Sequence, residues 1–391
     1  YGLIVPPKPG GQYVFNEETL KDIELILELK QLDFPLKDIH RILSLFRVSN
    51  LADRQDIEDL KAIYRRQKDR LSKEKTRISR IQQVLEDKIS RLDSKLHESG
   101  KEIGLPLRMI SLLCCPCCSS DLVIEQARMN QRYIFSANIS CPCGFKAKIE
   151  DGILMTENIN TSAYDKPDIV RELYKDLPPD LISLFQRSYN WMVDKLSARP
   201  LTNKVFLESY VNAWFFLHNH QHILEPSSML IVIDKFPETL KSYKQLIERQ
   251  GYNLDILYIS DSSTKPPLKQ NVVDINIDFF AVNEHNFYYH DFWLDHLYAY
   301  MKEDSIVLGT YFYFNNGIKS MKRLLEEYPE SYHYNFNRDY FRRSLSRKYR
   351  LLDMDEAGYT IDSGDNLGFS FHVKGEEMHL LPYLACIKNG D

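Results

Sequence analysis

Met229-Leu230-Ile231-Val232-Ile233-Asp234 is the stretch that decides the fold of the larger part of the chain. Its apolar run is short enough for a buried strand. A helix-like segment over 240–249 follows it, and then a second strand-like run, Leu254-Asp255-Ile256-Leu257-Tyr258-Ile259. Strand, helix and strand in this order are typical of a mainly parallel sheet with helices on both faces. We therefore expect an α/β fold here.

The same alternation continues in both directions along the chain. A strand-like run over 205–208 comes first, and segments over 272–280, 292–301 and 306–314 are interpreted as strand, helix and strand. We expect one α/β domain over residues 165–391. The chain holds 24 Tyr and 20 Phe, and these aromatic side chains would fill a large core or line a pocket.

Length and composition set the outer limits. At 391 residues the chain is long enough for roughly two to four domains. Its hydrophobic content of 43% and charged content of 27% are close to those of water-soluble globular proteins. The net charge of -5 excludes a uniformly basic coat protein for nucleic acid, although it allows a local basic patch. No run of 18 apolar residues occurs, so we expect no membrane span and no membrane partner.

Six of the seven cysteines fall between residues 114 and 143, which favours metal binding in a reducing compartment over secretion. Tetrahedral zinc takes four thiolates, and short knuckles present them in pairs. The predicted zinc ligands are Cys115, Cys118, Cys141 and Cys143. Cys114 and Cys117 offer an alternative first pair at the same spacing. Four thiolates leave no open position, so we expect a structural zinc in a ribbon over 112–157.

Residues 53–98 contain no Gly or Pro, and apolar residues recur there at alternating intervals of three and four. This spacing predicts one long helix of the coiled-coil type. The rest of its surface is polar, so we expect it to pair with a second copy and form a homodimer. Lys and Arg are frequent between residues 61 and 80, and we interpret this run as a solvated helix face.

Residues 1–50 begin with two short apolar runs, over 3–5 and 12–15, on either side of a Pro- and Gly-rich turn, which predicts a hairpin. Asn16 is expected to cap a helix, and a second helix begins after Leu32-Asp33-Phe34-Pro35. The order is that of a winged DNA-binding unit without its leading part. Because the sequence begins at Tyr1, we expect the base-reading residues to lie upstream of it.

Residues 3 to about 98 resemble the MerR family of bacterial transcription regulators, through Gly2-Leu3-Ile4, the turn ending at Gly11, Tyr13-Val14-Phe15-Asn16 and Leu32 to Ile39. The resemblance implies an antiparallel coiled-coil homodimer in the bacterial cytoplasm. Such a dimer binds double-stranded promoter DNA and acts on RNA polymerase indirectly, by deforming the DNA. Candidate phosphate contacts are Lys8, Tyr13 and Lys37.

Tyr13 stands where that family commonly has arginine, and Asp33 stands where it usually has glycine.

The ribbon and the α/β segment together resemble bacterial methyltransferases that carry an N-terminal zinc ribbon. In that family the first strand ends in an acid and a glycine-rich turn, because only glycine lets the backbone approach S-adenosylmethionine closely. Here Glu208 is followed by Ser209-Tyr210-Val211-Asn212-Ala213-Trp214, which has no glycine. Asp234 stands at the position of the ribose-binding acid. Asn283-Glu284-His285-Asn286 replaces the family's catalytic turn.

We therefore expect no S-adenosylmethionine and no catalytic residue, and we predict Tyr210, Trp214 and Asp234 as residues of a site for a small-molecule effector. The histidines at 218, 220 and 222, and those at 285, 290 and 296, are interpreted as structural rather than metal-binding or catalytic.

The sequence thus predicts a multidomain α and α/β protein. Its parts are a partial winged-helix unit, a long coiled-coil dimer helix, a zinc ribbon and a Rossmann-like methyltransferase-type domain. The leading hypothesis is a MerR-like regulator whose catalytically inactive methyltransferase-like domain senses a ligand or stabilises the dimer. The alternative is an active methyltransferase with a DNA-binding arm. In a third reading the C-terminal region only mediates protein contacts.

Overall fold

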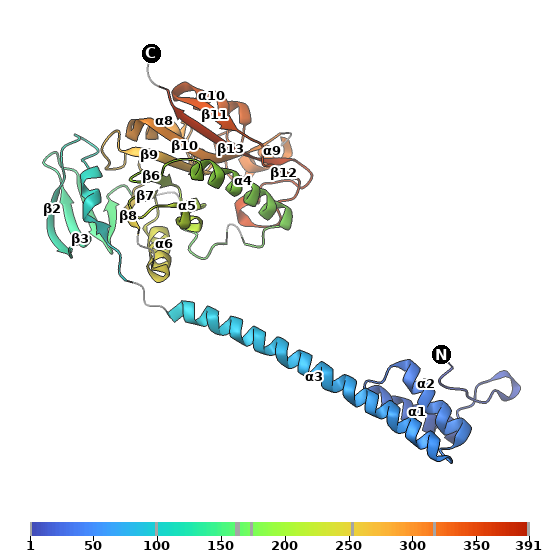
Figure 1. Cartoon of the computed structure of the whole chain (residues 1–391). Helices are drawn as coiled ribbons and strands as arrows, with labels where there is room; N and C mark the ends of the chain where they lie inside the picture. Colours follow the sequence, from blue (N-terminus) through green and yellow to red (C-terminus); the bar gives the residue numbers. More distant parts are fainter. Residues whose placement is uncertain are drawn as a thin grey trace. The chain divides into compact units, whose positions relative to one another are not determined.

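The computed structural model describes residues 2–97, 101–160, 165–172, 175–251, 254–315 and 318–388, with the side chains of 94–97 excepted. The chain divides into two compact units, residues 1–97 and 98–391. Figure 1 shows the first unit as helical and the second as a sheet with helices on both of its faces. Among the described residues no helix is both long and apolar enough to cross a membrane.

The first unit consists of α1 (Glu17–Gln31), α2 (Leu36–Ser49) and α3 (Arg54–His97). Asn16 caps α1 as predicted, because its Oδ1 accepts a hydrogen bond of 3.0 Å from the Thr19 N–H. The three helices share a small core built mainly from Ile and Leu side chains. Its buried members are Ile26, Leu29, Phe34, Ile39, Ile42, Leu43 and Ile63.

The turn between α1 and α2 explains the residue at position 33. Asp33 has φ 57°, a left-handed conformation that glycine adopts most easily. The side chain of Gln67 on α3 donates hydrogen bonds of 2.8 Å to the carbonyls of Leu32 and Asp33, and Arg70 lies 2.7 Å from the Asp33 carboxylate. Hydrogen bonds from Gln67 and Arg70 on α3 therefore stabilise a left-handed turn at Asp33, a conformation that glycine would adopt without such support.

No strand forms in residues 2–16, where the sequence predicts a hairpin. The segment is a loop with a short 3-10 turn at Pro9–Gly11 and one cross-loop backbone bond of 2.9 Å, from the Val14 N–H to the Pro7 carbonyl. Prolines at 6, 7 and 9 have no N–H to give to a strand ladder, which accounts for the difference. Arg47 on α2 anchors the loop, since its Nη2 donates to the Leu3 carbonyl at 2.6 Å.

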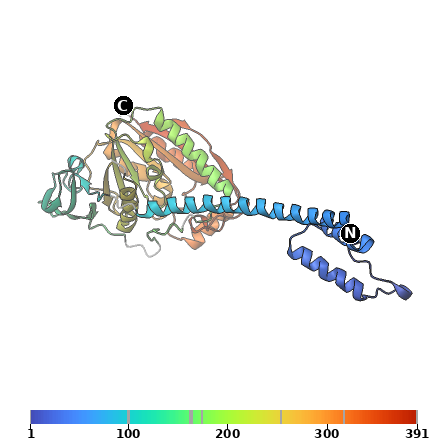
Figure 2. The same cartoon turned by 60° about the horizontal axis from the view of Figure 1, so that its bottom comes forward.

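The helix α3, drawn along its length in Figure 2, is 44 residues long, and its described side chains are buried only near its beginning. Near its beginning Ile63 is buried, and Tyr64 packs edge-on against Phe34, with ring centroids 5.3 Å apart. Further along, apolar side chains that recur every seven residues are exposed in the single chain. They are Leu71, Ile78, Leu85 and Leu92, with Ile81 beside them. We call this set the α3 stripe.

The second unit is built on one sheet. Its strands are β1 (Leu105–Pro106), β2 (Val123–Met129), β3 (Tyr133–Ser140), β4 (Lys146–Glu150), β5 (Ile153–Thr156), β6 (Val205–Ser209), β7 (Met229–Asp234), β8 (Asp255–Ser260), β9 (Val273–Phe279), β10 (Met301–Phe314), β11 (Tyr349–Met354), β12 (Gly358–Thr360) and β13 (Met378–Ile387). Its helices are α4 (Pro179–Ser197), α5 (Phe216–Asn219), α6 (Pro237–Gln250), α7 (Ala281–His285), α8 (Trp293–Leu297), α9 (Ile318–Glu327) and α10 (Arg338–Lys348).

The strand order β8-β7-β6-β9-β10-β13-β11 makes this a Rossmann-like, methyltransferase-type sheet. The strands from β8 to β10 are parallel, and β13 is antiparallel to β10 and β11. The order reverses between β6 and β9, and ligands of open α/β sheets bind at the carboxyl ends of the strands at such a switch point. Residues of α4 and α6 are buried in one apolar cluster and those of α8 and α10 in another, so each face of the sheet has its own core.

The cysteine-bearing ribbon shares this sheet. Strands β2 to β5 form an antiparallel series, and β5 then pairs in parallel with β8, through Ile153 opposite Tyr258 and Leu154 opposite Ile259. Leu154 is buried in the same apolar cluster as Ile259. The ribbon is therefore hydrogen-bonded to the β8 side of the methyltransferase-type strands.

Candidate ligand site and cysteine cluster

The loop after β6 lies at the switch point, and its backbone takes the shape expected of a glycine turn although it has no glycine. Tyr210 has φ 58°, which costs a non-glycine residue roughly 1–2 kcal/mol. The Tyr210 ring packs edge-on against Trp293, with centroids 5.0 Å apart, and its Oη lies 2.7 Å from Nδ1 of His285. These contacts hold an aromatic ring in the loop that the resemblance assigns to a nucleotide cofactor.

Asp234, the last residue of β7, directs its carboxylate into the protein's own backbone. One oxygen accepts from the Asn212 N–H at 2.8 Å and the other from the Phe236 N–H at 2.9 Å. Burial raises the pKa of Asp234 to about 7, although both N–H groups oppose the shift. The Asn212 side chain in turn accepts from the Asp168 N–H and the Thr239 hydroxyl. The position of the ribose-binding acid is thus tied to the loop after β6.

Glu208, near the end of β6, has a structural arrangement of the same kind. Its two carboxylate oxygens accept from the N–H groups of Phe216 and Leu217, at 2.6 and 2.9 Å, in the first turn of α5. Burial raises the pKa of Glu208 to about 8. The side chain therefore satisfies donors that the short helix α5 would otherwise leave without partners.

A buried ion cluster lies beside the loop. Lys235 forms ion pairs with Asp165 and Glu284, and its Nζ lies 4.4 Å from the centre of the Tyr288 ring. Burial lowers the pKa of Lys235, but the Glu284 and Asp165 carboxylates outweigh burial and raise it above its ordinary value. We call these three residues the Lys235 cluster. The lysine therefore stays charged, whereas burial raises the pKa of both acids, Asp165 and Glu284.

A cavity of about 340 Å³ opens at this edge of the sheet, next to the loop after β6. This volume is within the range of small-molecule sites. Polar and charged side chains of the wall come from Asp165, Lys166, Asp168, Glu172, Asn212, Asn283 and Glu284. Aromatic side chains of the wall are those of Phe280, Phe287, Tyr288, Phe312, Tyr328, Phe369 and Phe371. The cavity thus combines aromatic rings with several carboxylates.

The three residues predicted to bind a ligand lie outside this cavity. Tyr210 and Asp234 line a second hollow of about 20 Å³, which has room for little more than a water molecule. Trp214 lines neither space and packs among aromatic rings, with its centroid 5.5 Å from that of Phe185 and 6.1 Å from that of Phe279. Their role in binding a ligand stays a prediction.

The Lys235 cluster is not predicted from the sequence, although one signal points to it. Lys235 directly follows Asp234, the last residue of the parallel strand β7. Residues at the carboxyl ends of such strands lie at the edge of the sheet where ligands bind. Asp165 precedes β6 in the sequence and Glu284 follows β9. No local sequence pattern links either residue to Lys235. Asp274 lies at the amino end of β9, where its carboxylate pairs with Lys204 and Lys302.

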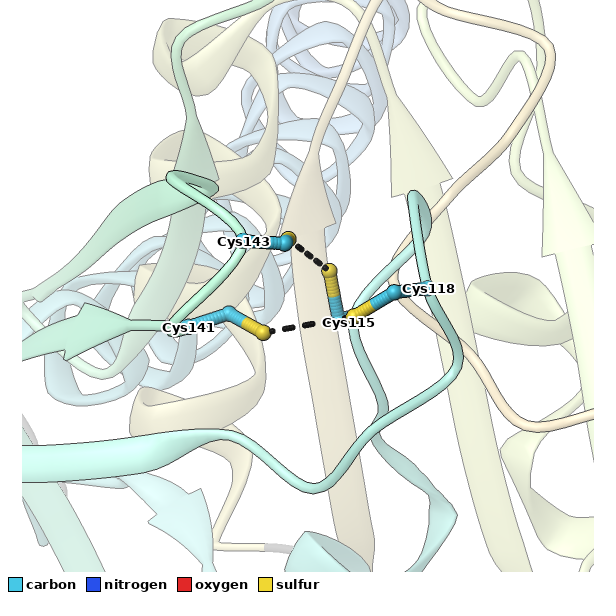
Figure 3. A group of neighbouring side chains, drawn as sticks. All are labelled: Cys115, Cys118, Cys141 and Cys143. Atoms are coloured by element: carbon cyan, nitrogen blue, oxygen red, sulfur yellow. Dashed lines mark hydrogen bonds between the residues drawn. The ribbon is translucent and has the colours of Figure 1, made fainter.

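The four predicted zinc ligands lie together at the end of the ribbon (Figure 3). The sulfur atoms of Cys115 and Cys143 are 3.3 Å apart, those of Cys118 and Cys141 are 3.5 Å apart, and all four lie within 4.8 Å of one another. Zinc–sulfur bonds of about 2.3 Å in a tetrahedron require sulfur atoms roughly 3.8 Å apart. The donor set and its spacing therefore fit a zinc ion.

Each knuckle is shaped by backbone bonds around its first cysteine. The Cys115 carbonyl accepts from the Ser119 N–H, and the Cys141 carbonyl accepts from the Gly144 N–H, both at 2.9 Å. Of the alternative pair, Cys114 is buried with its sulfur 3.2 Å from the Leu268 carbonyl, and Cys117 is exposed. Neither joins the group of four, so the geometry favours Cys115 and Cys118 as the first pair of ligands.

The candidate DNA contacts all lie on the surface of the first unit. Lys8 and Tyr13 come from the N-terminal loop, and the Lys8 Nζ lies 4.8 Å from the centre of the Tyr13 ring, which is 64% exposed. Lys37 is exposed in the first turn of α2. Their contact with phosphate stays a prediction.

Comparison with protein families finds a match within the first of these two units. Residues 1–45 match the family described as MerR HTH family regulatory protein. The chain carries a MerR HTH family domain. This match covers the loop, α1 and most of α2, as the sequence resemblance predicted. No curated protein matches the chain.

Solved structures that resemble the chain include methyltransferases at low identity. A SAM-dependent methyltransferase from Geobacter sulfurreducens, solved with S-adenosyl-L-homocysteine, is 12% identical, with a TM-score of 0.40, and the match covers 57% of this chain and 99% of that one. Geranyl diphosphate C-methyltransferase from Streptomyces coelicolor is 9% identical, with a TM-score of 0.41, and the match covers 59% and 88%. At these scores the fold assignment rests on the strand order of the sheet.

Proposed function

We propose that the protein is a dimeric DNA-binding transcription regulator in which a methyltransferase-like domain without methyl-transfer activity binds a small effector molecule. The observation that carries this proposal is the loop after β6. Tyr210 occupies it in a left-handed conformation, and Asp234 is hydrogen-bonded to its backbone. A nucleotide cofactor would need that volume and that carboxylate, so the loop favours a binding domain over a methyltransferase.

DNA binding is supported by the MerR HTH domain and by the cations exposed on its surface. The α3 stripe supports the dimer. Half-exposed Leu and Ile side chains at a seven-residue interval are the pattern with which two helices pack against each other. The proposed partners are therefore a second copy of the chain and double-stranded promoter DNA, and the effect on RNA polymerase is indirect.

The proposed effector site is the 340 Å³ cavity. Its aromatic side chains suit the apolar part of a small molecule. The lining carboxylates suit hydrogen-bond donors on that molecule, and they belong to Asp165, Asp168, Glu172 and Glu284. Zinc at the cysteine cluster is proposed as a structural ion, because four thiolates complete its coordination and leave no open position for substrate.

Isothermal titration calorimetry with S-adenosylmethionine and S-adenosylhomocysteine tests the proposal. We expect no heat of binding at ligand concentrations up to about 1 mM. A Kd of about 1 mM corresponds to a binding free energy of about −4 kcal/mol, so any complex would be weaker than that. Binding with a micromolar Kd would overturn the inactive assignment. The DNA-binding part is tested separately, by a gel shift of the protein on DNA from upstream of its own gene.

The second candidate, an active methyltransferase with a DNA-binding arm, is favoured by one observation. Asp234 keeps the strand-end position of the ribose-binding acid, and the cavity lies next to it at the switch point. Incubation of the protein and DNA with S-adenosylmethionine labelled on its methyl group separates the two candidates. Transfer of label to DNA or protein would establish the second, and its absence, together with the silent calorimetry, supports the first.

A further inference from the structure

Two histidines and an aspartate converge on one point beside the loop after β6. His285 ends α7, Asp291 lies in the connection that follows, and His296 is on α8. Nε2 of His285 lies 2.8 Å from one oxygen of Asp291, and Nε2 of His296 lies 2.5 Å from the other. One nitrogen or oxygen from each side chain can be chosen so that all three lie within 4.8 Å of one another.

Tyr210 and two neighbouring aromatic rings fix the orientation of the His285 imidazole. Its second nitrogen, Nδ1, lies 2.7 Å from the Tyr210 hydroxyl, so Nε2 is the atom presented to Asp291. The ring is stacked on Tyr289 at 4.7 Å and packs against Trp293 at 5.2 Å. Metal-binding histidines ordinarily have this arrangement, with one nitrogen on the ion and the other hydrogen-bonded to an oxygen.

The cluster is buried on one side and open on the other. The His285 side chain is fully buried, that of His296 is 26% exposed and that of Asp291 is 52% exposed. The Asn286 side chain fixes the loop, since its Nδ2 donates to the Asp291 backbone carbonyl at 2.8 Å. A small ion can therefore enter from solvent at Asp291 and reach nitrogens that the protein holds in place.

We propose that His285, Asp291 and His296 form a second metal site, separate from the cysteine cluster, for a divalent ion of the zinc class. Two imidazole nitrogens and a carboxylate oxygen are ligands that Zn²⁺ accepts, and three protein ligands leave a fourth position open to water or another ligand. Tyr210 is the positioning residue, because its hydroxyl orients His285. The site thus connects metal binding to the residue that occupies the loop after β6.

Metal counting on the full chain tests this site. The chain is stripped with a chelator under reducing conditions, reloaded with Zn²⁺ and dialysed, and bound zinc is measured by atomic emission. We expect two equivalents in the unmodified chain and one in His296→Gln and Asp291→Asn. The matched control is His290→Gln, which changes an exposed histidine of the same segment that is absent from the cluster, and it should keep two.

Co²⁺ in place of Zn²⁺ distinguishes the two sites, because only the cysteine cluster gives thiolate-to-cobalt absorption. An equivalent that produces no such absorption and disappears in His296→Gln supports the proposal, whether or not the cysteines are loaded. A chain whose bound cobalt is all accounted for by thiolate absorption would overturn it, and so would a folded His296→Gln that keeps both equivalents. Circular dichroism establishes that each variant is folded.

Tyr210→Phe provides a second, milder test. It keeps the three ligands but removes the oxygen that orients His285, so the Kd of the second zinc should rise about tenfold while the count at saturation stays at two. An unchanged Kd would overturn the positioning role of Tyr210.

Discussion

The α3 stripe gives the most direct prediction, that Leu85→Asp separates the proposed dimer. Leu85 is 53% exposed in the single chain, so burying the rest of its side chain in a helix pair contributes about 1 kcal/mol per copy. The substitution removes this from both chains and places two carboxylates against apolar neighbours, each costing at least about 1 kcal/mol. The total of about 4 kcal/mol corresponds to roughly a thousandfold rise in the dimer Kd.

Sedimentation velocity over a range of concentrations measures this Kd. Ser90→Asp is the matched control, since it adds the same charge to an exposed position five residues away, outside the α3 stripe, and should leave the Kd within about threefold. Circular dichroism verifies that both variants keep their helix content. The reasoning is refuted if the unmodified chain is monomeric at micromolar concentration, or if Leu85→Asp and Ser90→Asp shift the Kd equally.

Three further predictions concern the other sites. Cys118→Ser should lose the zinc of the cysteine cluster and lower the unfolding temperature of the second unit, as measured by zinc content and calorimetry; a full zinc load in the variant would contradict the ligand set. Glu208 has its pKa raised from 4.5 to about 8, so the folded chain holds its proton over this range and the stability it contributes is lost as the pH rises from 4.5 towards 8. Urea unfolding should therefore show a free-energy difference between the unmodified chain and Glu208→Gln that falls over this range, and a constant difference would contradict it. Lys37→Ala should weaken binding to all DNA sequences alike and lower the slope of log K against log salt by about 1 in gel shifts, whereas an unchanged slope would remove Lys37 from the interface.

The parts that were predictable from the sequence depend on short-range patterns. The spacing within each cysteine knuckle already places its thiols on one turn, and the alternation around Met229–Asp234 already specifies parallel strands. Asn16 and the turn at Asp33 were likewise visible, because helix capping and turn geometry are set by neighbouring residues.

The structural features that could not be predicted from the sequence depend on contacts between segments far apart in the chain. The pairing of β5 with β8 joins residues about a hundred positions apart, and no sequence pattern in either strand predicts it. The same holds for Asp165 and Glu284, which meet at Lys235 only after the sheet has formed. The hairpin predicted over residues 3–15 does not form for another reason, because the prolines between its two apolar runs have no N–H to donate to a strand ladder.

The pairing of β5 with β8 also has a consequence for how the protein behaves at high concentration. A parallel sheet that ended at β8 would present a row of free backbone N–H and C=O groups, a template onto which strands of other molecules can add. The ribbon covers that border with its own strand. If zinc keeps the ribbon folded, removing the ion uncovers the border, and the first visible result should be light scattering by aggregates rather than a clean melting transition.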